Sequence, residues 1–275
     1  MGSERCAESE TGRALKDFIE KKGKTMSMKH CTAVALAGGQ GRRMGTDIQK
    51  QYLDINGKPL LYYSLRVFEE SEIIDDVVLV VGKGQEEYVR KEILDRYELQ
   101  KVVRVVEGGK ERYDSVWAGL KAVQALQNNH VDASEQKENY VFIHDGARPF
   151  VTEEILERAY TKVRECKACV VGMPSKDTVK LVDEHAFAKE TPDRNYVWII
   201  QTPQVFETSL IFEAYSRLMR EKCIQVTDDA MVVEQMMGLP VKMVEGSYEN
   251  IKITTPEDLD IADVFVKRGQ KNRKK

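Results

Sequence analysis

The sequence predicts an α/β fold, a Rossmann-like three-layer sandwich in which helices cover both faces of a mostly parallel sheet. Short runs of β-branched apolar residues alternate along the chain with segments of helical periodicity, and this alternation is typical of that architecture. The predicted strands are residues 32–36, 77–81, 102–106, 140–144, 168–173, 197–200 and 241–244. In open α/β sheets of this kind, ligands bind at the carboxyl ends of the strands.

Three segments carry the clearest helical signals. One helix is predicted to begin near Asp114 and another near Thr152, each with apolar residues repeating at helical spacing. The last helix has Thr255 at the position suited to an N-cap and Pro256 at the first helical position. We expect this helix to pack through Leu259, Ala262 and Phe265.

The chain divides into one domain with two polar ends. We assign residues 1–30 to an N-terminal extension, 31–268 to a single domain and 269–275 to a basic tail, with disorder expected from Lys267 onward because apolar-free residues cannot offset their ordering entropy. Within the domain, residues 175–195 read as a strand and a turn with too few apolar residues for a core. This segment is predicted to be a projecting β-arm.

The composition excludes several classes of partner. The 42 Lys and Arg residues against 45 Asp and Glu give a net charge of -3, which provides no global field for holding a nucleic acid. No window approaches the ~18 consecutive apolar residues of a membrane span. The five cysteines are irregularly placed, which favours a reducing compartment, and we predict a cytoplasmic protein that binds small molecules.

A glycine-rich turn follows the first predicted strand. Residues 37–45 read AGGQGRRMG, and the glycines let the backbone approach a polyphosphate closely while Arg43 and Lys50 supply positive charge. For the loop alone, a tight strand-to-helix turn with solvated arginines remains the alternative. The loop lacks the Gly-Lys-Ser/Thr ending of a P-loop and misses the dinucleotide fingerprint by one residue, which disfavours a nicotinamide dehydrogenase.

Further motifs make the resemblance to known enzymes specific. The glycine loop with KQYL at 50–53 resembles the signature of nucleotidyltransferases that activate sugars and sugar alcohols. The later motifs are EGGKERYDSV at 107–116, HDGARPF at 144–150, KDTVK at 176–180, TPDR at 191–194, QTPQVF at 201–206, TDDA at 227–230 and ENIKITTPEDL at 249–259. Together they resemble the 2-C-methyl-D-erythritol 4-phosphate cytidylyltransferase family over residues 32–266.

The resemblance implies a CTP-dependent reaction that needs no general base. The phosphate of 2-C-methyl-D-erythritol 4-phosphate, already ionised, would attack the α-phosphorus of CTP and release pyrophosphate, so charge neutralisation and positioning must supply the catalysis. The implied catalytic residues are Arg43, Lys50 and Lys252. Asp145, at the end of a predicted strand, is the predicted contact for Mg²⁺; a cap of the following turn is the alternative.

The resemblance also implies two binding surfaces. Cytosine and the triphosphate would contact Ala37, Gly38, Gly39, Gly41, Gly109, Lys110 and Ser115. Many relatives carry Asp where this chain has Lys110, so we expect the backbone rather than the side chain to act there. The alditol phosphate would contact Arg148, Thr178, Arg194 and Thr202. The family's arm exchanges across a homodimer and completes the neighbouring site.

Neighbouring polar residues are given supporting roles. We predict His144 to be a buried or supporting histidine rather than a proton carrier, and Asp228 and Asp229 to open a helix. Cys166 and Cys169 form a C-x-x-C without a second pair, which favours structural cysteines over a zinc site.

Three competing functions remain. A ribitol 5-phosphate cytidylyltransferase would share the fold, the CTP site and Lys252, although the arm motifs resemble the methylerythritol version more closely. A glycosyltransferase would need an Asp-x-Asp motif where this chain has Asp145-Gly146-Ala147. A non-catalytic nucleotide sensor would be expected to lose Lys252 or Asp145, and both are present.

Overall fold

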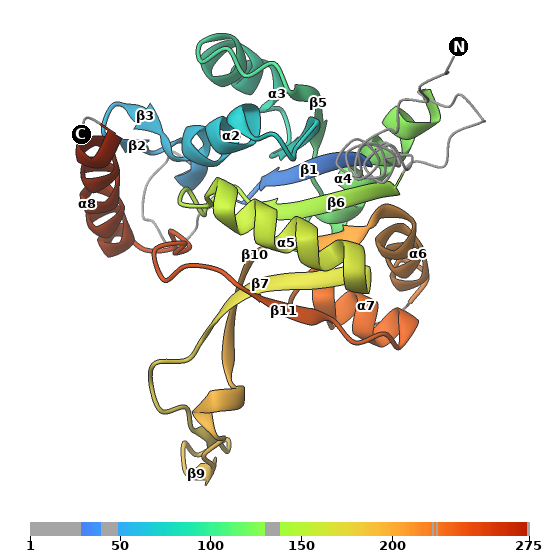
Figure 1. Ribbon diagram of the computed structural model, residues 1–275, viewed down its shortest axis with the longest axis vertical. Coiled ribbons are helices and arrows are strands. Elements are labelled where there is room, and N and C mark those ends of the chain that lie inside the picture. Colours follow the sequence, from blue (N-terminus) through green and yellow to red (C-terminus); the bar gives the residue numbers. More distant parts are fainter. Residues whose placement is uncertain (1–28, 40–48, 130–137, 222, 224, 274–275) are drawn as a thin grey trace, which may run out of the picture.

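A seven-stranded sheet forms the centre of the molecule in the computed structural model, which describes residues 29–39, 49–129, 138–221, 223 and 225–273 (Figure 1). Its strand order is β11-β7-β10-β6-β1-β4-β5. Neighbouring strands pair in parallel except β10, which is antiparallel to both β6 and β7. The bounds are β1 (Lys29–Ala37), β4 (Asp76–Val81), β5 (Val102–Glu107), β6 (Glu138–Asp145), β7 (Ala168–Pro174), β10 (Trp198–Glu207) and β11 (Lys242–Glu245). The predicted mostly parallel sheet is confirmed.

Helices cover both faces of this sheet. One face carries α2 (Leu60–Glu70), α3 (Glu86–Val89) with the π-helical turn Arg90–Asp95, and α5 (Glu153–Cys166). The other face carries α4 (Arg112–Asn129), α6 (Thr208–Leu218) and α7 (Asp229–Met237). Alternation along β1 explains this division, because Ala33 and Ala35 pack into the first core while Val34 packs into the second. The three-layer prediction is therefore confirmed.

Strand β10 is much longer than the predicted 197–200. It runs from Trp198 to Glu207 and so contains the whole QTPQVF motif. Pro203 lacks a backbone N–H, but the register with β7 shifts between Ile200 and Gln204, so the proline lies where the ladder is already interrupted. The irregularity lets a central strand contain Pro203 and turns the polar residues beside it toward the end of β6.

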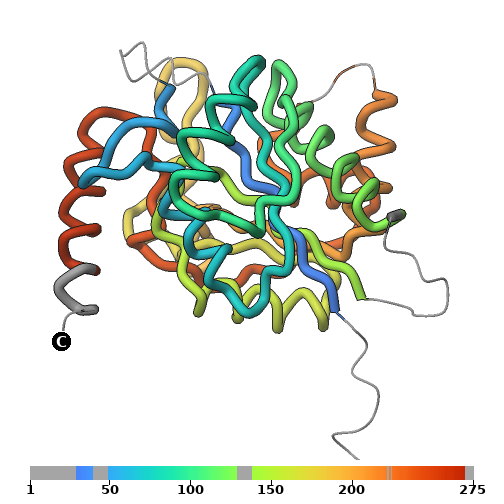
Figure 2. The backbone as a smooth tube through the Cα atoms, turned by 90° about the horizontal axis from the view of Figure 1, so that it is seen from above, coloured from blue at the N-terminus to red at the C-terminus, as the bar shows by residue number. Residues whose placement is uncertain are grey.

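The last helix, α8 (Pro256–Arg273), packs beside the short hairpin of β2 (Asp54–Ile55) and β3 (Lys58–Pro59) rather than on the sheet (Figure 2). It begins at Pro256 as predicted, and the Asp258 carboxylate accepts hydrogen bonds from the amides of Thr254 and Thr255. The disorder predicted from Lys267 was wrong for residues up to 273. Lys and Arg are good helix formers, and an i,i+4 pair between Lys267 and Asp263 supports this turn.

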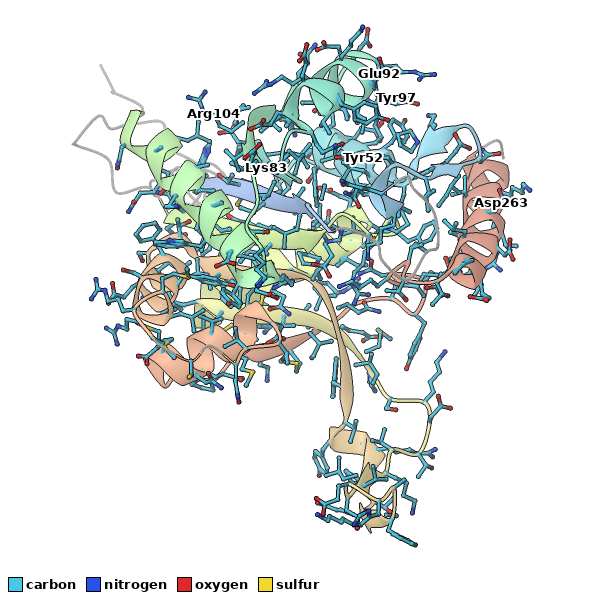
Figure 3. All side chains as sticks on the ribbon, turned by 180° about the vertical axis from the view of Figure 1, so that it is seen from behind. Tyr52, Lys83, Glu92, Tyr97, Arg104 and Asp263 are labelled. Atoms are coloured by element: carbon cyan, nitrogen blue, oxygen red, sulfur yellow. The ribbon has the colours of Figure 1, made fainter. Side chains whose placement is uncertain are left out.

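The predicted arm projects from the body between β7 and β10 (Figure 1). It contains β8 (Leu181–Val182), β9 (Ala188–Glu190) and the 3-10 turn Arg194–Tyr196. The arm and its side chains stand away from the body of the molecule (Figure 3). Two of its apolar side chains are largely exposed, Phe187 at 72% and Tyr196 at 86%. In the described part of the chain, no helix is long and apolar enough to cross a membrane.

Candidate active site

A cavity of about 500 Å³ opens at the carboxyl ends of β1, β5 and β6. From β1 the chain builds outward through β4 and β5, whereas β6 lies on the other side of β1, so the cavity sits where the strand order reverses. The predicted residues that line it are Ala37, Gly38, Gly39, Lys50, Gly109, Lys110, Ser115, Asp145 and Lys252. Segments that lie far apart in sequence therefore meet at one edge of the sheet.

The loop after β5 is shaped by Ser115, which stands near the start of α4. Its hydroxyl accepts a hydrogen bond from the Gly109 amide at 3.1 Å and donates to the Glu111 carbonyl at 3.3 Å. A Cβ at Gly108 would lie 2.6 Å from the same hydroxyl, so only glycine fits there. The Ser115 side chain thus holds the loop that borders the cavity.

Lys50 approaches the cavity from the 3-10 turn Lys50–Tyr52. Its Nζ lies 3.4 Å from the carbonyl oxygen of Ile253. The next residue, Gln51, is buried and donates to the carbonyl oxygen of Ala37 at 2.5 Å, which ties this turn to the end of β1. This hydrogen bond fixes the position of the Lys50 backbone relative to the end of β1. Two further predicted residues, Gly41 and Arg43, lie outside the described residues.

The Asp145 carboxylate is held between two cations. Its Oδ2 accepts from Lys252 Nζ at 2.6 Å, and its Oδ1 accepts from Arg112 Nε at 3.3 Å. Burial by itself would raise the pKa of Asp145, but Arg112 and Lys252 outweigh it and keep that pKa well below its usual range. The carboxylate is therefore ionised at neutral pH and faces the cavity as a hard oxygen ligand.

Arg112 also lines the cavity, although it is not among the predicted site residues. Its guanidinium forms two parallel hydrogen bonds to the fully buried Asp229, at 2.9 and 2.8 Å, and the Tyr215 hydroxyl donates to the same carboxylate. Asp228 and Asp229 do open α7, as predicted, with Asp228 as the N-cap. Arg112 lies within the EGGKERYDSV motif and Asp229 within TDDA, so motif membership was the available signal.

Behind Asp145, His144 and Thr202 form a buried chain of hydrogen bonds. The Thr202 hydroxyl accepts from the Asp145 amide at 3.1 Å and lies 3.0 Å from His144 Nδ1, while His144 Nε2 lies 3.0 Å from the carbonyl oxygen of Arg148. A carbonyl can only accept, so Nε2 carries the proton and Nδ1 accepts from Thr202. Burial lowers the pKa of His144 to about 4, and the ring is neutral at pH 7.

The four residues predicted to bind the alditol phosphate lie outside the cavity lining. The Arg148 guanidinium donates to the carbonyl oxygens of Asn250 at 2.8 Å and Ile200 at 3.2 Å. Thr202 is buried beneath Asp145. Thr178 and Arg194 are exposed on the arm and do not line this cavity.

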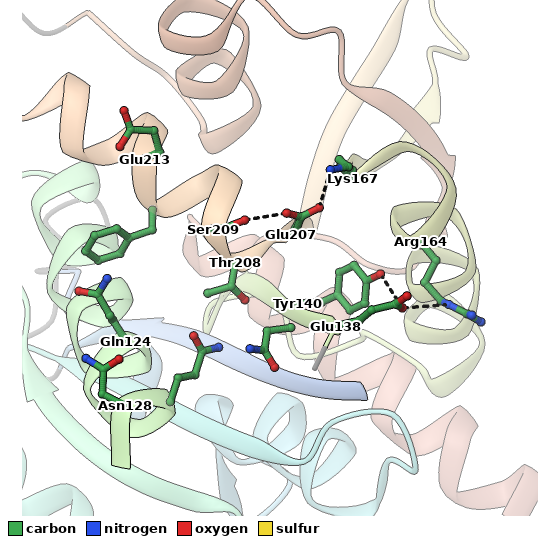
Figure 4. A pocket seen from close by; sticks show the side chains of 13 residues that line it. Gln124, Asn128, Glu138, Tyr140, Arg164, Lys167, Glu207, Thr208, Ser209 and Glu213 are labelled. Atoms are coloured by element: carbon green, nitrogen blue, oxygen red, sulfur yellow. Dashed lines mark hydrogen bonds and ion pairs between the residues drawn. The ribbon is translucent and has the colours of Figure 1, made fainter. Parts of the chain in front are cut away.

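A second cavity of about 870 Å³ lies at the opposite end of the strands, beside the start of β6 and the end of β10 (Figure 4). Its acidic side chains already have partners. Glu207 accepts from Ser209 at 2.6 Å and pairs with Lys167 at 3.1 Å, and Glu138 pairs with Arg164 at 3.8 Å. This cavity has neither the glycine turn nor the cation pair of the first, so it is not the candidate active site.

The first cavity suits a reaction at phosphorus. Gly38 and Gly39 line the cavity, where their backbone can approach a polyphosphate, and Lys50 and Lys252 can neutralise charge that develops in the transition state. Arg112 and Lys252 meanwhile keep one carboxylate ionised. This combination at the reversal point of a mostly parallel sheet defines the chain as an α/β nucleotidyltransferase.

Comparisons with known proteins give the family. The sequence model of the 2-C-methyl-D-erythritol 4-phosphate cytidylyltransferase family matches residues 31–268. The protein of that name from Lachnospira eligens is 49% identical over 237 residues, spanning 86% of this chain and 99% of the relative. The one from Caldanaerobacter subterraneus subsp. tengcongensis is 44% identical over 237 residues, with coverages of 86% and 99%. This chain belongs to that family.

A solved structure agrees with this assignment. The crystal structure of 4-diphosphocytidyl-2C-methyl-D-erythritol synthase from Anaerococcus prevotii is 34% identical and superimposes with a TM-score of 0.72. The match covers 87% of this chain and 96% of that one. Sheet and helices are therefore shared over nearly the whole domain.

Proposed function

We propose that this protein transfers the cytidylyl group of CTP to 2-C-methyl-D-erythritol 4-phosphate, giving 4-diphosphocytidyl-2-C-methyl-D-erythritol and pyrophosphate in the non-mevalonate isoprenoid pathway. Family membership supports this substrate over ribitol 5-phosphate. The single observation that carries the chemistry is the convergence of Lys50, Asp145 and Lys252 on one cavity beside Gly38 and Gly39.

The reaction exchanges one phosphorus–oxygen bond for another. An oxygen of the substrate phosphate forms a bond to the α-phosphorus, and the bond from that phosphorus to the oxygen bridging to the β-phosphate breaks, so the electron pair leaves with pyrophosphate. The nucleophile is already an anion, and the neutral, buried His144 has no part in proton transfer. Lys50 and Lys252 neutralise the charge on the five-coordinate phosphorus, and Arg43 is proposed to join them.

The nucleotide is proposed to lie along the lining residues. The base would sit against the backbone of Gly109 and Lys110, where amide and carbonyl groups can read its exocyclic amine and O2. The phosphates would follow Gly38 and Gly39 toward Lys50. Ser115 contributes by fixing the loop, since its hydroxyl already bonds Gly109.

The carboxylate of Asp145 is proposed to hold Mg²⁺. Among the described residues, no group of three or more acidic, histidine or cysteine side chains converges as a metal site. Mg²⁺ suits a single carboxylate because it takes its other ligands from phosphates and water, and Asp145 is an ionised oxygen donor facing the cavity. When bound, the metal would supply charge neutralisation on the phosphates.

A homodimer is proposed to complete the site. The arm exposes Phe187 and Tyr196, and the start of β10 beside it exposes Ile199, which favours burial against a second copy of the chain. Arg194 and Thr178 on the arm would then reach the substrate phosphate in the partner's cavity. Arg148 and Thr202 would support that end from behind. We also propose a cytoplasmic location, because the four cysteines in the described residues are free thiols.

The arm exchange can be tested by mixing two inactive variants. Arg194→Ala and Lys252→Ala chains are denatured together and refolded, and product formation from CTP is measured. A mixed dimer has one cavity with an intact Lys252 and a partner arm with an intact Arg194, so activity should return. No recovery, with mixed dimers demonstrated by native mass spectrometry, would show that Arg194 does not act across the interface.

The nucleotide and product are tested by mass spectrometry. The enzyme with Mg²⁺ and 2-C-methyl-D-erythritol 4-phosphate should form the diphosphocytidyl product from CTP and little product from UTP. Equal use of UTP would contradict the proposed reading of the base by Gly109 and Lys110.

A further inference from the structure

We propose that Arg112 is a positioning residue: Asp229 fixes its guanidinium, Arg112 holds the Asp145 carboxylate in the cavity, and Lys252 is the partner that leaves. The proposal rests on the proposed function, since it takes Asp145 to be the contact for Mg²⁺. It divides the two cations beside Asp145 into one that stays and one that moves to the phosphates.

The fixed end of this chain of contacts is Asp229. Its carboxylate is fully buried and receives two hydrogen bonds from Arg112 and one from Tyr215. Its amide and that of Ala230 both donate to Gln204 Oε1 at 2.9 Å, which ties the start of α7 to β10. A buried carboxylate with this many partners keeps one orientation, because leaving any of them unpaired is costly.

Arg112 transmits that orientation to the metal-binding carboxylate. Its two terminal nitrogens face Asp229, and its Nε faces Asp145 Oδ1 at 3.3 Å. The planar guanidinium fixes the directions of all three bonds, so Asp145 cannot turn without breaking one. Burial would lower the pKa of Arg112, but Asp229 and Asp145 raise it well above its ordinary value, and its charge is permanent.

Lys252 has fewer partners than Arg112. In the described part of the chain, its Nζ donates to Asp145 Oδ2 alone, whereas the Arg112 guanidinium also makes two hydrogen bonds to the buried Asp229. An ammonium on a flexible stem can exchange a carboxylate for a phosphate, whereas Arg112 would have to abandon Asp229 to do so. Transfer of Lys252 would free Oδ2 for the metal while Oδ1 stays on Arg112.

Two substitutions test the fixed cation. Arg112→Lys keeps the charge but loses the paired geometry, and Asp229→Asn removes the charge that anchors it. We measure Mn²⁺ binding by electron paramagnetic resonance in the presence of α,β-methylene CTP, which does not react. Each variant should bind Mn²⁺ roughly 10- to 100-fold more weakly, the usual effect of losing a partner of a metal ligand. The double variant should bind Mn²⁺ no more weakly than the single variant with the lower Mn²⁺ affinity, because both substitutions act through one contact.

Lys252→Met tests the cation that leaves. In the enzyme without nucleotide, where Lys252 still pairs with Asp145, removing this competitor should leave Mn²⁺ binding as tight as in the wild type, or tighter, while turnover in the complete assay falls. Wild-type Mn²⁺ affinity in Arg112→Lys, additive losses in the double variant, or weakened Mn²⁺ binding in Lys252→Met would each overturn the proposal. If Asp229→Asn does not fold, the Mn²⁺ affinity of Arg112→Lys alone tests the proposal. Failure of the proposed function looks different: the wild-type enzyme would then release no pyrophosphate with the methylerythritol substrate.

Discussion

Acid should destabilise this protein through His144 before it affects the carboxylates of the site. The imidazole is fully buried, its Nε2–H donates to the carbonyl oxygen of Arg148, and its Nδ1 accepts from the Thr202 hydroxyl. Protonation would place a charge in the core and turn Nδ1 into a donor. The site therefore favours the neutral ring.

The sign and size of the effect follow from the pKa. Burial lowers the pKa of His144 from 6.5 to about 4, so between these values the unfolded chain binds a proton that the folded chain does not. The contribution is fully present above the unfolded pKa and is lost as the pH falls toward the folded one. This difference corresponds to about 3 kcal/mol of unfolding free energy at neutral pH.

Urea unfolding, followed by tryptophan fluorescence at pH 7.5 and pH 4.5, measures this loss. His144→Gln is the matched variant, since it keeps a polar side chain but cannot titrate. It should be less stable than the wild type at pH 7.5, yet lose much less free energy on acidification. An equal loss in the two proteins would refute the reasoning, because the titrating group would then lie elsewhere.

Three further results are expected. Lys252→Ala should lower kcat by about 100- to 1000-fold, the usual cost of losing one donor to the transition state, in a pyrophosphate-release assay. Phe187→Ser, at a side chain that is 72% exposed on the arm, should shift the sedimentation profile from dimer toward monomer. Gly119→Ala should cost about 1–3 kcal/mol in urea unfolding, because the new Cβ would lie 2.5 Å from Val34 Cγ1.

Each of these has a control in the chain. Leu239→Ser changes an exposed apolar residue on the body and should leave the sedimentation profile unchanged. Gly269→Ala adds a Cβ where nothing lies within 4 Å, so it should be neutral or stabilising. Lys252→Ala should unfold at nearly the wild-type urea concentration, because Arg112 still pairs with Asp145. If a control variant changed as much as the variant it is paired with, the physical reason given for that variant's effect would be wrong.

The sheet was predictable because its strands are short apolar runs separated by helical periodicity. Local pattern failed where a tertiary contact decides the structure. Strand β10 continues past Pro203 because β7 pairs with it again, and β6 begins to pair with it, from Gln204 onward. Helix α8 continues past Lys267 although nothing apolar marks the extension. The continuation of β10 has no local signal in the sequence, whereas that of α8 has only helix-forming residues and the i,i+4 pair of Asp263 with Lys267.

The candidate site divides in the same way. Glycines and lysines after strands indicated the cavity, and their convergence follows from parallel strands ending at one edge. The pairing of Arg112 with Asp229 joins residues 117 positions apart, and no spacing rule predicts it. The sequence also does not indicate which motif residues are buried. Thr202 belongs to a strong motif, but only the structure places its hydroxyl between Asp145 and His144.

Pyrophosphate release from CTP and Mg²⁺ tests the central claim most directly. Pyrophosphate release by the wild-type enzyme is measured with 2-C-methyl-D-erythritol 4-phosphate and, separately, with ribitol 5-phosphate. The Lys252→Ala variant serves as the blank. We predict release with the methylerythritol substrate alone and its loss in the variant. Release only with ribitol 5-phosphate, or undiminished release in Lys252→Ala, would contradict the account.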